Sequence, residues 1–304
     1  MKYYLSICAI FRNEAPYLLE WIEFHRFMGV EHFYLYNNLS NDDYLSVLKN
    51  YIDSGLVTLR DWPEMWRRET QSNAYMDCLE RYRNESRWIA FIDLDEFLFA
   101  PNAESLPDVL SEYERFPGIV VNWQVYGSSG HKKKPEGLVI ENFTMKAPTN
   151  WIRNRRTKSI VDPSKTIRPR GAHLFEYGHG ELAVTERQIQ VKNVGTTAIG
   201  RVARRILVGI MPKISIDPYS FNLCHPQSVS VNKLRINHYI VKSREEALAA
   251  MQYHNQHKYL NQMDWLRYHD RNDERDDILL KFVPEIKRRL PTGYVENVSL
   301  GKQV

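Results

Sequence analysis

Residues 88–96 read Trp-Ile-Ala-Phe-Ile-Asp-Leu-Asp-Glu, an apolar run that passes directly into three carboxylates. Short continuous apolar runs of this kind, rich in aromatic and β-branched residues, are typical of strands that are buried on both faces. Acidic side chains beside such a strand are costly to bury unless a cation or hydrogen bonds offset the cost. This stretch therefore predicts a buried strand whose carboxyl end carries a polar site.

Alternating strand and helix signals precede this run. Apolar stretches predict strands over residues 3–11, 31–36, 56–60 and 88–92. Helical spacing of apolar residues predicts helices between them, from an Asn13 cap to Gly29 and over residues 44–52 and 70–83. Because strands joined by helices form βαβ units, the sheet should be mostly parallel and flanked by helices. The predicted class is α/β and Rossmann-like, with a ligand at the carboxyl ends of the strands.

The pattern is less regular after Glu96. A helix is expected over residues 106–115, and strands are expected over residues 118–126 and 233–241. Ser243 and Glu246 form a capping box that opens a helix to about residue 259, and residues 276–290 are expected to be helical with an interruption at Pro284. The loop 127–135, Gly-Ser-Ser-Gly-His-Lys-Lys-Lys-Pro, is basic and rich in turn residues, and we interpret it as a candidate lid.

Composition excludes several classes of protein. The 304 residues, 43% hydrophobic and 26% charged, are typical of a globular chain and not of a disordered one or a small disulfide scaffold. A formal net charge of +4 is too small to indicate a nucleic-acid partner, so none is expected. The three cysteines form neither a disulfide framework nor a Cys-x-x-Cys site. Since no apolar stretch approaches the roughly 18 residues of a membrane span, we expect a cytoplasmic protein.

Three basic segments are candidates to contact something anionic. They are residues 151–170, residues 201–213, and a C-terminal helix that carries Lys281, Lys287, Arg288 and Arg289. The second and third could rest on an anionic membrane as amphipathic surface elements. A solvated face over an ordinary core would give the same pattern, so both interpretations stay open.

Polar clusters follow two further strands at the predicted sheet edge. Arg-Asn-Glu at 12–14 ends the first strand, and Asn-Asn at 37–38 ends the second. Because the carboxyl ends of neighbouring parallel strands meet at one edge, both clusters should lie near Asp93 and Asp95. Amide groups can pair with a base edge or a ribose, whereas two carboxylates can hold one hard divalent cation that also binds phosphate oxygens. The combination suits a nucleotide.

The motif content narrows the kind of nucleotide site. Neither Gly-x-Gly-x-x-Gly nor Gly-x-x-x-x-Gly-Lys-Ser/Thr occurs, which disfavours dinucleotide dehydrogenases and P-loop enzymes. Asp-x-Asp alone is a weak pattern, because a helix N-cap with acidic neighbours gives the same residues. The position of Asp93 and Asp95 after the fourth strand of an α/β sheet favours a metal site.

Several of these stretches, taken together, resemble glycosyltransferase family 92 and its bacterial family 2-like relatives. The resemblance rests on residues 8–21, His25, 29–38, 71–78, 88–98 and 126–131, with weaker matches at 158–160, His173, 237–239 and 242–243. It implies a GT-A-type α/β fold with a less regular C-terminal acceptor side. It also implies a UDP-sugar donor, most often UDP-galactose, a divalent Mn²⁺ or Mg²⁺, and transfer with inversion.

The resemblance further implies how the chain is divided. Residues 1–130 would form the nucleotide-sugar-binding half, residues 131–242 the acceptor and diphosphate side of the same domain, and residues 243–304 the C-terminal helices. The acceptor would be a glycan or lipid-linked glycan in surface polysaccharide or lipopolysaccharide synthesis. Animal and plant members usually begin with a membrane anchor and this chain starts at its first strand, so we expect a bacterial form, peripheral at the inner face of the plasma membrane.

The same resemblance implies site residues. Those around the nucleotide sugar would be Arg12, Asn13, Glu14, Asn37, Asn38, Asp93 and Lys158. The metal ligands would be Asp93 and Asp95, with His173 or His238 added. Asn37 and Asn38 depart from the family pattern, since many members carry an acidic residue there that grips the nucleoside. An amide can hydrogen-bond the ribose or the base in its place.

Inverting transfer requires a general base to deprotonate the acceptor hydroxyl. Glu141 and Glu176 are the predicted catalytic residues, because both lie in strand-like runs after the 127–135 loop; Glu96, Asp162 and His173 are the alternatives. Two other functions stay open: a nucleotide-sugar-binding or glycan-binding protein with a degenerate site, and a glycoside hydrolase. The hydrolase fits less well, because the two aspartates are too close along the chain to flank a sugar.

Overall fold

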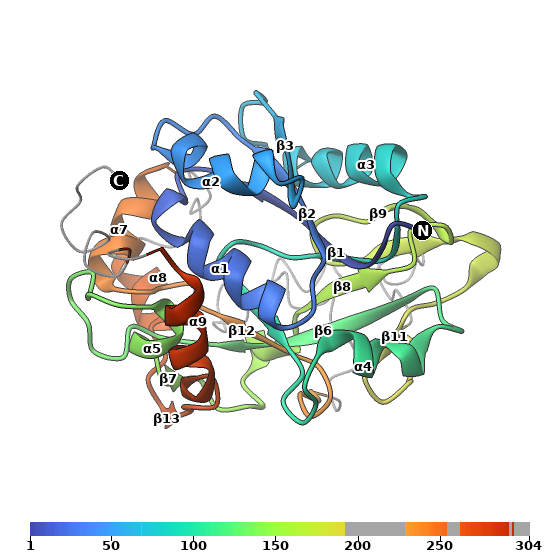
Figure 1. Cartoon of the computed structure of the whole chain (residues 1–304). Helices are drawn as coiled ribbons and strands as arrows, with labels where there is room; N and C mark the ends of the chain where they lie inside the picture. Colours follow the sequence, from blue (N-terminus) through green and yellow to red (C-terminus); the bar gives the residue numbers. More distant parts are fainter. Residues whose placement is uncertain (68, 192–228, 254–261, 292–293, 295–304) are drawn as a thin grey trace.

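A nine-stranded mixed sheet runs through the protein, in the order β3-β2-β1-β4-β8-β6-β12-β5 with β11 added on β6 (Figure 1). The structure, a computed structural model, describes residues 1–67, 69–191, 229–253, 262–291 and 294. The strands of this sheet are β1 (Tyr3–Phe11), β2 (His32–Asn37), β3 (Val57–Asp61), β4 (Ser86–Phe91), β5 (Glu96–Phe99), β6 (Gly118–Val125), β8 (Thr157–Val161), β11 (Val184–Thr185) and β12 (Arg235–His238).

Helices and two small two-stranded sheets surround the central sheet. The helices are α1 (Ala15–Phe27), α2 (Tyr44–Asp53), α3 (Thr70–Tyr82), α4 (Leu106–Leu110), α5 (Val139–Asn142), α7 (Arg244–Tyr253), α8 (Gln262–His269) and α9 (Val283–Arg289). The small sheets pair β9 (Thr166–Pro169) with β10 (Phe175–Tyr177), and β7 (Met145–Lys146) with β13 (Glu274–Arg275).

The predicted parallel half of the sheet is confirmed. Strands β3, β2, β1 and β4 run parallel to one another, with α1, α2 and α3 as their crossovers. Beyond β4 the direction changes, because β8 is antiparallel to both β4 and β6. Strand β5 was not expected from the sequence; it follows the acidic turn directly and pairs antiparallel with β12. The whole is the mostly parallel α/β sheet that the sequence predicts.

Alternation along the central strands divides the core between the two faces of the sheet. In β1, Leu5 and Ile7 belong to the larger core with α1, α2, α4 and α9, whereas Cys8 and Ile10 belong to a second core with α3. Successive side chains of a strand point to opposite faces, so a strand covered on both sides must be apolar throughout. This explains why β1, β2 and β4 lack polar alternation.

The start of α1 differs from the prediction. Asn13 is not its cap: α1 begins at Ala15, and no side chain caps it from the N-cap position at Glu14. Asn13 instead adopts a left-handed conformation with a φ of 57°, and its side-chain oxygen accepts a hydrogen bond from the N–H of Asn41 at 2.8 Å. The Ala15 N–H donates to Asp42 at 2.8 Å, so the turn after β2 satisfies the helix start from outside.

The C-terminal helices follow the predicted signals only in part. Ser243 and Glu246 form the expected capping box, with the Glu246 N–H donating to Ser243 Oγ at 3.3 Å and the Ser243 N–H donating to Glu246 Oε2 at 3.0 Å. Pro284 does not interrupt a helix; it lies in the first turn of α9, where its missing N–H has no consequence. The basic segment 201–213 and the predicted helix end near residue 259 lie outside the described residues.

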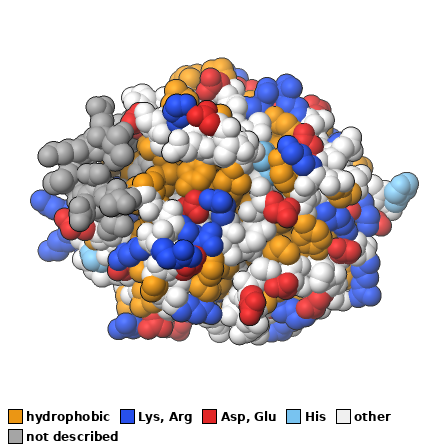
Figure 2. Space-filling view, in the orientation of Figure 1, with side chains coloured by type: hydrophobic (Ala, Val, Ile, Leu, Met, Phe, Trp, Pro, Cys, Tyr) orange, Lys and Arg blue, Asp and Glu red, His pale blue; other side chains and the backbone are white. Residues whose placement is uncertain are grey.

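Three basic side chains of the C-terminal helix form ion pairs with carboxylates of the protein. Lys287 pairs with Glu141 at 2.7 Å, and Arg288 and Arg289 pair with Glu285 at 2.8 and 2.7 Å. On the face shown in Figure 2, lysine and arginine side chains are interspersed with aspartate and glutamate. Within the described part of the chain, no helix has both the length and the apolar character needed to cross a membrane.

A buried carboxylate joins α1 to the loop-rich half of the protein. Glu20 is 2% exposed, and its two oxygens accept the N–H groups of Val139 and Ile140 at 2.8 and 3.0 Å. Burial raises the pKa of Glu20 to about 7, although the two backbone hydrogen bonds lower it. The folded state therefore holds this proton more strongly than the unfolded chain does.

This linkage predicts how stability depends on pH. Because the folded pKa of Glu20 is raised, its contribution to the free energy of unfolding should fall as pH rises from about 4.5 to about 7, by up to about 3 kcal/mol. Urea denaturation across this range should show a shallower decline for Glu20→Gln than for wild type, whereas Glu80→Gln, which alters an exposed carboxylate on α3, should leave the profile unchanged. Parallel wild-type and Glu20→Gln profiles would contradict the prediction.

Candidate active site

The acidic turn lies at the carboxyl end of β4, where the run of four neighbouring parallel strands meets the antiparallel strand β8. The chain leaves β4 at Phe91, turns through Asp93 and Asp95, and enters β5 at Glu96. The end of β12 lies against this turn, because His238 is the ladder partner of Glu96 and the Tyr239 N–H donates to the Asp95 carbonyl at 2.8 Å. Two segments distant in sequence are thus fixed together by backbone hydrogen bonds.

Asp95 and His238 face one another across this contact. His238 Nε2 lies 3.2 Å from Asp95 Oδ2, and the His238 side chain is 5% exposed. Burial alone would raise the pKa of Asp95, but His238, with Lys242 and Lys158, lowers it well below its ordinary value. Asp95 is therefore a carboxylate at neutral pH, and a quarter of its side chain remains exposed to a ligand.

Asp93 is partly exposed, and each of its carboxylate oxygens contacts a side chain of the protein. Lys158 Nζ lies 2.8 Å from Asp93 Oδ2, and Gln71 donates to Asp93 Oδ1 at 2.6 Å. The Tyr75 hydroxyl also lies 3.4 Å from Oδ1. One carboxylate of the predicted pair is thus already neutralised by a cation of the protein itself.

Lys158 comes from β8 and its side chain is fully buried. Burial alone would lower its pKa, but Asp93 and Glu96 raise it, so the ammonium keeps its charge. Because the Lys158 side chain is fully buried against Asp93, its predicted contact with the nucleotide sugar stays a prediction. In the structure, Lys158 binds the acidic turn.

Glu96 is the buried carboxylate of the turn and contacts its backbone. Its side chain is fully buried, Oε2 accepts the Asp93 N–H at 2.8 Å, and Oε2 lies 3.7 Å from Lys158 Nζ. Burial raises the pKa of Glu96 well above its ordinary value; Lys158 opposes this shift, and Asp93 and Asp95 add to it. Glu96 therefore orients the backbone of the turn and is sealed from any acceptor, which disfavours the base role considered for it.

The second candidate histidine lies behind an indole ring. The Trp123 ring centroid is 4.3 Å from that of His238 and 5.4 Å from that of His173. His173 Nδ1 is hydrogen-bonded to the Thr157 carbonyl at 3.0 Å, and burial, with Lys158 and Arg156, lowers the pKa of His173 well below its ordinary value. Of the two histidines, the structure places only His238 in contact with an aspartate of the turn.

The loop after β1 lies close to this edge. The Arg12 side chain is half-buried, and its Nε has no hydrogen-bond partner among the described residues. Burial raises the pKa of Glu14, Lys242 opposes the shift, and Asp95 adds to it, so the two carboxylates are electrostatic neighbours. The Asn13 N–H donates to Ser40 at 2.9 Å. Glu14 thus lies in the electrostatic neighbourhood of Asp95, and the predicted contacts of Arg12, Asn13 and Glu14 with a nucleotide stay predictions.

Asn37 and Asn38 are engaged within the protein. The Asn37 amide donates to Tyr44 and Asp61 at 2.8 and 2.9 Å, and its oxygen accepts the Ser40 N–H at 3.0 Å. Asn38 donates to two backbone carbonyls, at 2.8 and 2.7 Å. The Asn38 side-chain oxygen is buried and has no hydrogen-bond partner among the described residues. A direct contact of either amide with a ligand stays a prediction.

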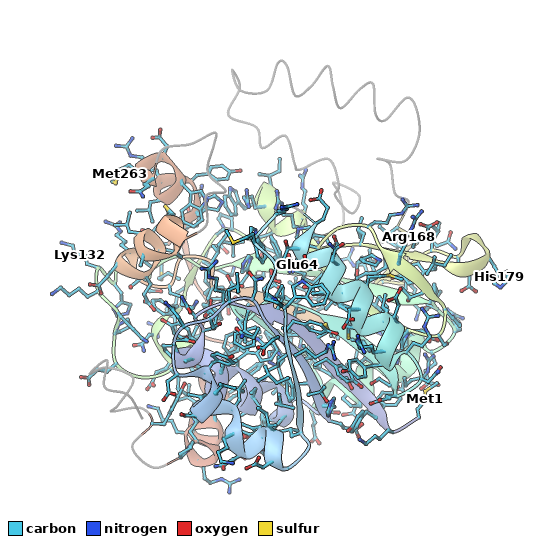
Figure 3. All side chains as sticks on the ribbon, turned by 90° about the horizontal axis from the view of Figure 1, so that it is seen from above. Met1, Glu64, Lys132, Arg168, His179 and Met263 are labelled. Atoms are coloured by element: carbon cyan, nitrogen blue, oxygen red, sulfur yellow. The ribbon has the colours of Figure 1, made fainter. Side chains whose placement is uncertain are left out.

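The two predicted catalytic carboxylates have cationic partners of their own. Glu141, on α5, pairs with Lys287 at 2.7 Å, and Glu176, on β10, pairs with Arg168 at 2.7 Å. Figure 3 shows Arg168 and the nearby His179 at one end of the protein, and Lys132 at the opposite end. Among the described residues, neither carboxylate forms a hydrogen bond or ion pair with Asp93, Asp95 or His238, so their base role stays a prediction.

The predicted lid, 127–135, is anchored at several backbone positions. The Ser128 N–H donates to Asp270 Oδ1 at 2.7 Å, and the Ser129 N–H donates to Asn272 Oδ1 at 2.7 Å. Its other end is held by α7, where the Arg244 N–H donates to the His131 carbonyl at 3.1 Å. These contacts hold the loop in place beside the site, and opening it as a lid would break them.

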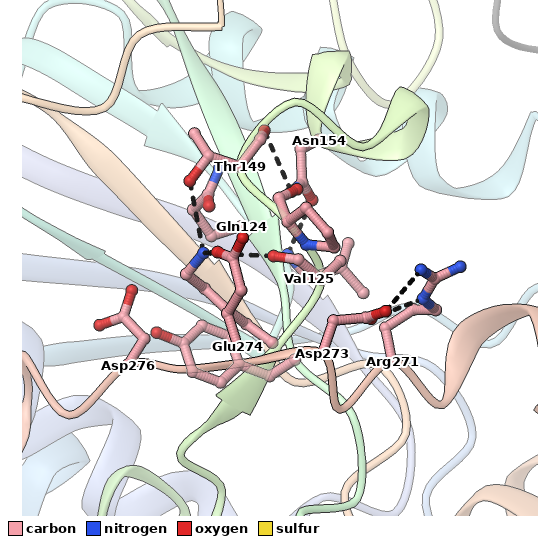
Figure 4. Close-up of polar contacts among 12 residues, drawn as sticks. Gln124, Val125, Thr149, Asn154, Arg271, Asp273, Glu274 and Asp276 are labelled. Carbon is pink, nitrogen blue, oxygen red and sulfur yellow. Dashed lines mark hydrogen bonds and ion pairs between the residues drawn. The ribbon is translucent and has the colours of Figure 1, made fainter.

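A polar network supports the neighbouring end of β6 (Figure 4). Asn154 accepts the Val125 N–H at 2.9 Å and donates to the Thr149 carbonyl at 3.3 Å. Lys146, which is buried, donates to Glu274 at 2.6 Å. Arg271 and Asp273 make two hydrogen bonds of 2.8 Å each. The segment after β6 is thereby fixed, and with it the position of Trp123.

Sequence reasoning missed some residues that the structure brings to the site. Gln71 hydrogen-bonds Asp93, and Lys242 lies 3.8 Å from Glu14. The signal was present, because residues 71–78 and 242–243 belong to the stretches that resemble the family. The sequence does not show that the start of α3 and the end of β12 pack against the acidic turn.

Asp95 and His238 are the candidate donors for the predicted divalent cation. Adjacent ligands of an octahedral Mg²⁺ or Mn²⁺ are about 3 Å apart, and Asp95 Oδ2 and His238 Nε2 are separated by 3.2 Å. The described part of the chain holds no group of three or more His, Cys, Asp or Glu side chains arranged around one such position. Protein cation sites of this kind are often completed by substrate phosphates and water.

Comparison with known proteins identifies the sequence family. The family description "Glycosyltransferase family 92" matches residues 2–193, which is more than half of the chain. A glycosyltransferase family 92 protein of Oryza sativa subsp. japonica is 35% identical over 164 residues, covering 52% of this chain and 27% of that protein. A galactan beta-1,4-galactosyltransferase of Arabidopsis thaliana is 36% identical over 128 residues, covering 38% of this chain and 25% of that protein.

Other similarities add context. A family 92 protein of Caenorhabditis elegans is 27% identical over 191 residues, covering 56% of this chain and 35% of that protein. Among solved structures, S. aureus TarS 1-349 in complex with UDP matches with a TM-score of 0.36 and 13% identity, over 68% of this chain and 65% of that one. The matched region is about a quarter to two fifths of the curated relatives' length. These relatives come from plants and a nematode, so the expected bacterial origin finds no support in them.

The buried ion cluster predicts a large stability difference between two lysine substitutions. Lys158→Met should lower the free energy of unfolding by about 3–5 kcal/mol, because it leaves Asp93 and Glu96 without their buried cation. Lys49→Met, which removes an exposed pair with Asp53, should cost no more than about 1 kcal/mol. Urea denaturation measures both. Adding Glu96→Gln should restore part of the Lys158→Met loss, and equal effects of the two lysine substitutions would refute this account of the cluster.

Proposed function

Because the chain belongs to glycosyltransferase family 92, we propose that it transfers galactose from a UDP-sugar to a glycan acceptor, with inversion at the anomeric carbon. The observation that carries the proposal is the placement of Asp93 and Asp95 at the carboxyl end of β4, with His238 facing Asp95. Carboxyl ends of parallel strands are where open α/β sheets bind nucleotides.

The choice of galactose has separate support. Some relatives of this chain are described as galactan beta-1,4-galactosyltransferases, and the similarity covers 38 to 58% of this chain. The acceptor class proposed with it is a glycan. A lipid-linked glycan of a surface polysaccharide or lipopolysaccharide, and a cytoplasmic location with peripheral membrane contact, stay predictions from the sequence.

Asp95 and His238 would hold the Mn²⁺ or Mg²⁺, and Asp93 would not share it directly. A divalent cation bound there supplies positive charge to the departing diphosphate. Asp93 keeps its pair with Lys158 and can accept a hydrogen bond from the donor through its exposed third. Arg12 and Glu14, at the end of β1, would contact the nucleoside.

Two other functions are separated from this one by simple properties. A glycoside hydrolase would need no nucleotide, and its two carboxylates would have to lie on opposite sides of a sugar; here Asp93 is tied to Lys158. A binding protein with a degenerate site would take up the UDP-sugar without turnover. Metal-dependent UDP binding therefore distinguishes the transferase from a glycoside hydrolase. Release of UDP in the presence of acceptor glycans distinguishes it from a binding protein.

Calorimetric titration with UDP tests the donor and the metal together. Wild-type protein should bind UDP in the presence of Mn²⁺ and lose at least tenfold in affinity in chelator. Asp95→Asn and His238→Ala should each show the same loss while staying folded, because each removes one cation ligand. Glu104→Gln, which alters an exposed carboxylate, is the matched control. If chelator has no effect on UDP affinity, the metal proposal is wrong; if UDP does not bind at all, the donor proposal is wrong.

Kinetics of two glutamine variants test the base. Glu141→Gln and Glu176→Gln test whether either carboxylate is the general base. A variant that loses only its surface ion pair should retain most of the wild-type kcat. Loss of a true general base lowers the rate by about 10²–10⁴-fold. UDP release measured with galactan oligosaccharides as acceptors would reveal such a loss. A drop of that size with unchanged UDP affinity would identify that residue as the base.

A further inference from the structure

The departing diphosphate needs a cation that a ligand can reach. Lys158 does not qualify, because its ammonium is fully buried against Asp93 and Glu96. Two other lysines reach the same edge of the sheet from different segments. Lys134 comes from the 127–135 loop, and Lys242 from the turn between β12 and α7.

Both lysines converge on one aromatic ring. Lys242 Nζ lies 4.2 Å from the ring centroid of Tyr17, and Lys134 Nζ lies 4.6 Å from it. Tyr17 is in the first turn of α1, directly after residues 12–14. A ring face attracts a cation, but two ammonium groups gathered at one ring also repel each other. The fold thus concentrates positive charge where an anion would relieve the repulsion.

The two ammonium groups are only partly compensated by the protein. Lys242 Nζ lies 3.8 Å from Glu14 Oε2. Across the residues that the structure describes, Lys134 Nζ has no carboxylate oxygen within 4.0 Å. Burial and the charge of Lys242 lower the pKa of Lys134 to about 8. A phosphate group would strengthen the charged form of Lys134, because it supplies the missing negative partner.

The segments that carry these lysines are held before any ligand arrives. The Glu245 N–H donates to the Lys132 carbonyl at 3.1 Å, and the Lys134 N–H donates to Glu245 Oε2 at 3.2 Å. Lys242 itself adopts a left-handed conformation with a φ of 50°, which Ser243 follows with the capping box of α7. Such preorganised charges need no rearrangement to meet a ligand.

The lysine pair adjoins the predicted cation position. The Lys242 charge lowers the pKa of Asp95, and the Asp95 charge raises that of Glu14, so all three groups share one electrostatic neighbourhood. The backbone gives the same result, because Tyr239, three residues before Lys242, donates its N–H to the Asp95 carbonyl at 2.8 Å. An anion that touches both lysines would therefore lie beside Asp95.

We infer that Lys134 and Lys242, which both lie against the Tyr17 ring, form the diphosphate subsite. The inference rests on the proposed function, since the ligand is the diphosphate of the nucleotide-sugar donor. The two lysines would bind the departing diphosphate directly by charge, whereas Asp95 and His238 would act on it through the bound cation. A phosphate group on the acceptor has the same phosphoryl chemistry, so it could occupy the lysine pair in place of the donor diphosphate.

The experiment compares UDP, UMP and inorganic pyrophosphate by calorimetric titration at fixed Mn²⁺. Lys134→Gln and Lys242→Gln should each weaken UDP binding about tenfold, the range of a charge-assisted hydrogen bond, and should weaken UMP binding less. Inorganic pyrophosphate should compete with UDP in wild type and fail to do so in the double variant. Lys133→Gln is the matched control, because Lys133 is an exposed neighbour on the same loop. Lys134→Arg and Lys242→Arg, which keep the charge, should retain most of the UDP affinity.

Each outcome decides one proposal. UDP affinity that stays at the Lys133→Gln level in both glutamine variants, with native circular dichroism, overturns the inference and assigns the lysine pair to an acceptor phosphate or to structure. If wild type binds no UDP, the proposed donor fails, and the pyrophosphate titration still decides the lysine pair. Pyrophosphate binding lost in the double variant supports the subsite, and pyrophosphate binding retained there refutes it.

Discussion

The arrangement of the candidate site depends on one ion cluster, formed by Lys158, Asp93 and Glu96. Lys158 reaches from β8 to Asp93 and Glu96, and so ties the first antiparallel strand of the sheet to the turn that ends its parallel half. Without the cation, the buried Glu96 and the partly exposed Asp93 would lie close together with no positive partner, which is unfavourable. With it, the turn is held rigidly enough for Asp95 to project outward. Asp93 is thereby engaged by the protein itself, whereas Asp95 faces His238 and keeps a quarter of its side chain exposed.

Local signals predicted the parallel half of the fold well. The strands and helices up to β4 are covered on both faces by apolar side chains, so hydrophobic runs and turn residues mark their limits. Strand β5 was missed because its four residues follow the acidic turn without a break, and they become a strand only through pairing with β12. The start of α1 was misjudged for a related reason, since Asp42 from another turn replaces the expected cap.

The acidic turn could be predicted from the sequence, but the side chains around it could not. A strand that runs into Asp-x-Asp identifies the turn, and family resemblance named His173 and His238 as alternatives, of which His238 faces Asp95. Which of several lysines meets a ligand depends on burial, and burial is set by packing between distant segments: Lys158 is buried, whereas Lys134 and Lys242 converge on Tyr17. Asn37 likewise lies at the end of a parallel strand, where a nucleotide contact was predicted, but its amide donates to Tyr44 and Asp61.

The contact between His238 and Asp95 also has a consequence for folding. The two residues are 143 positions apart in the sequence, and β12 lies between β6 and β5 in the sheet. Contacts of such long range form late and slow folding, because loop closure precedes any compensating interaction. During synthesis, β1 to β4 can assemble well before β12 leaves the ribosome. The proposed cation pair is completed only when β12 joins the sheet, so a chain that stops short of it lacks a complete site.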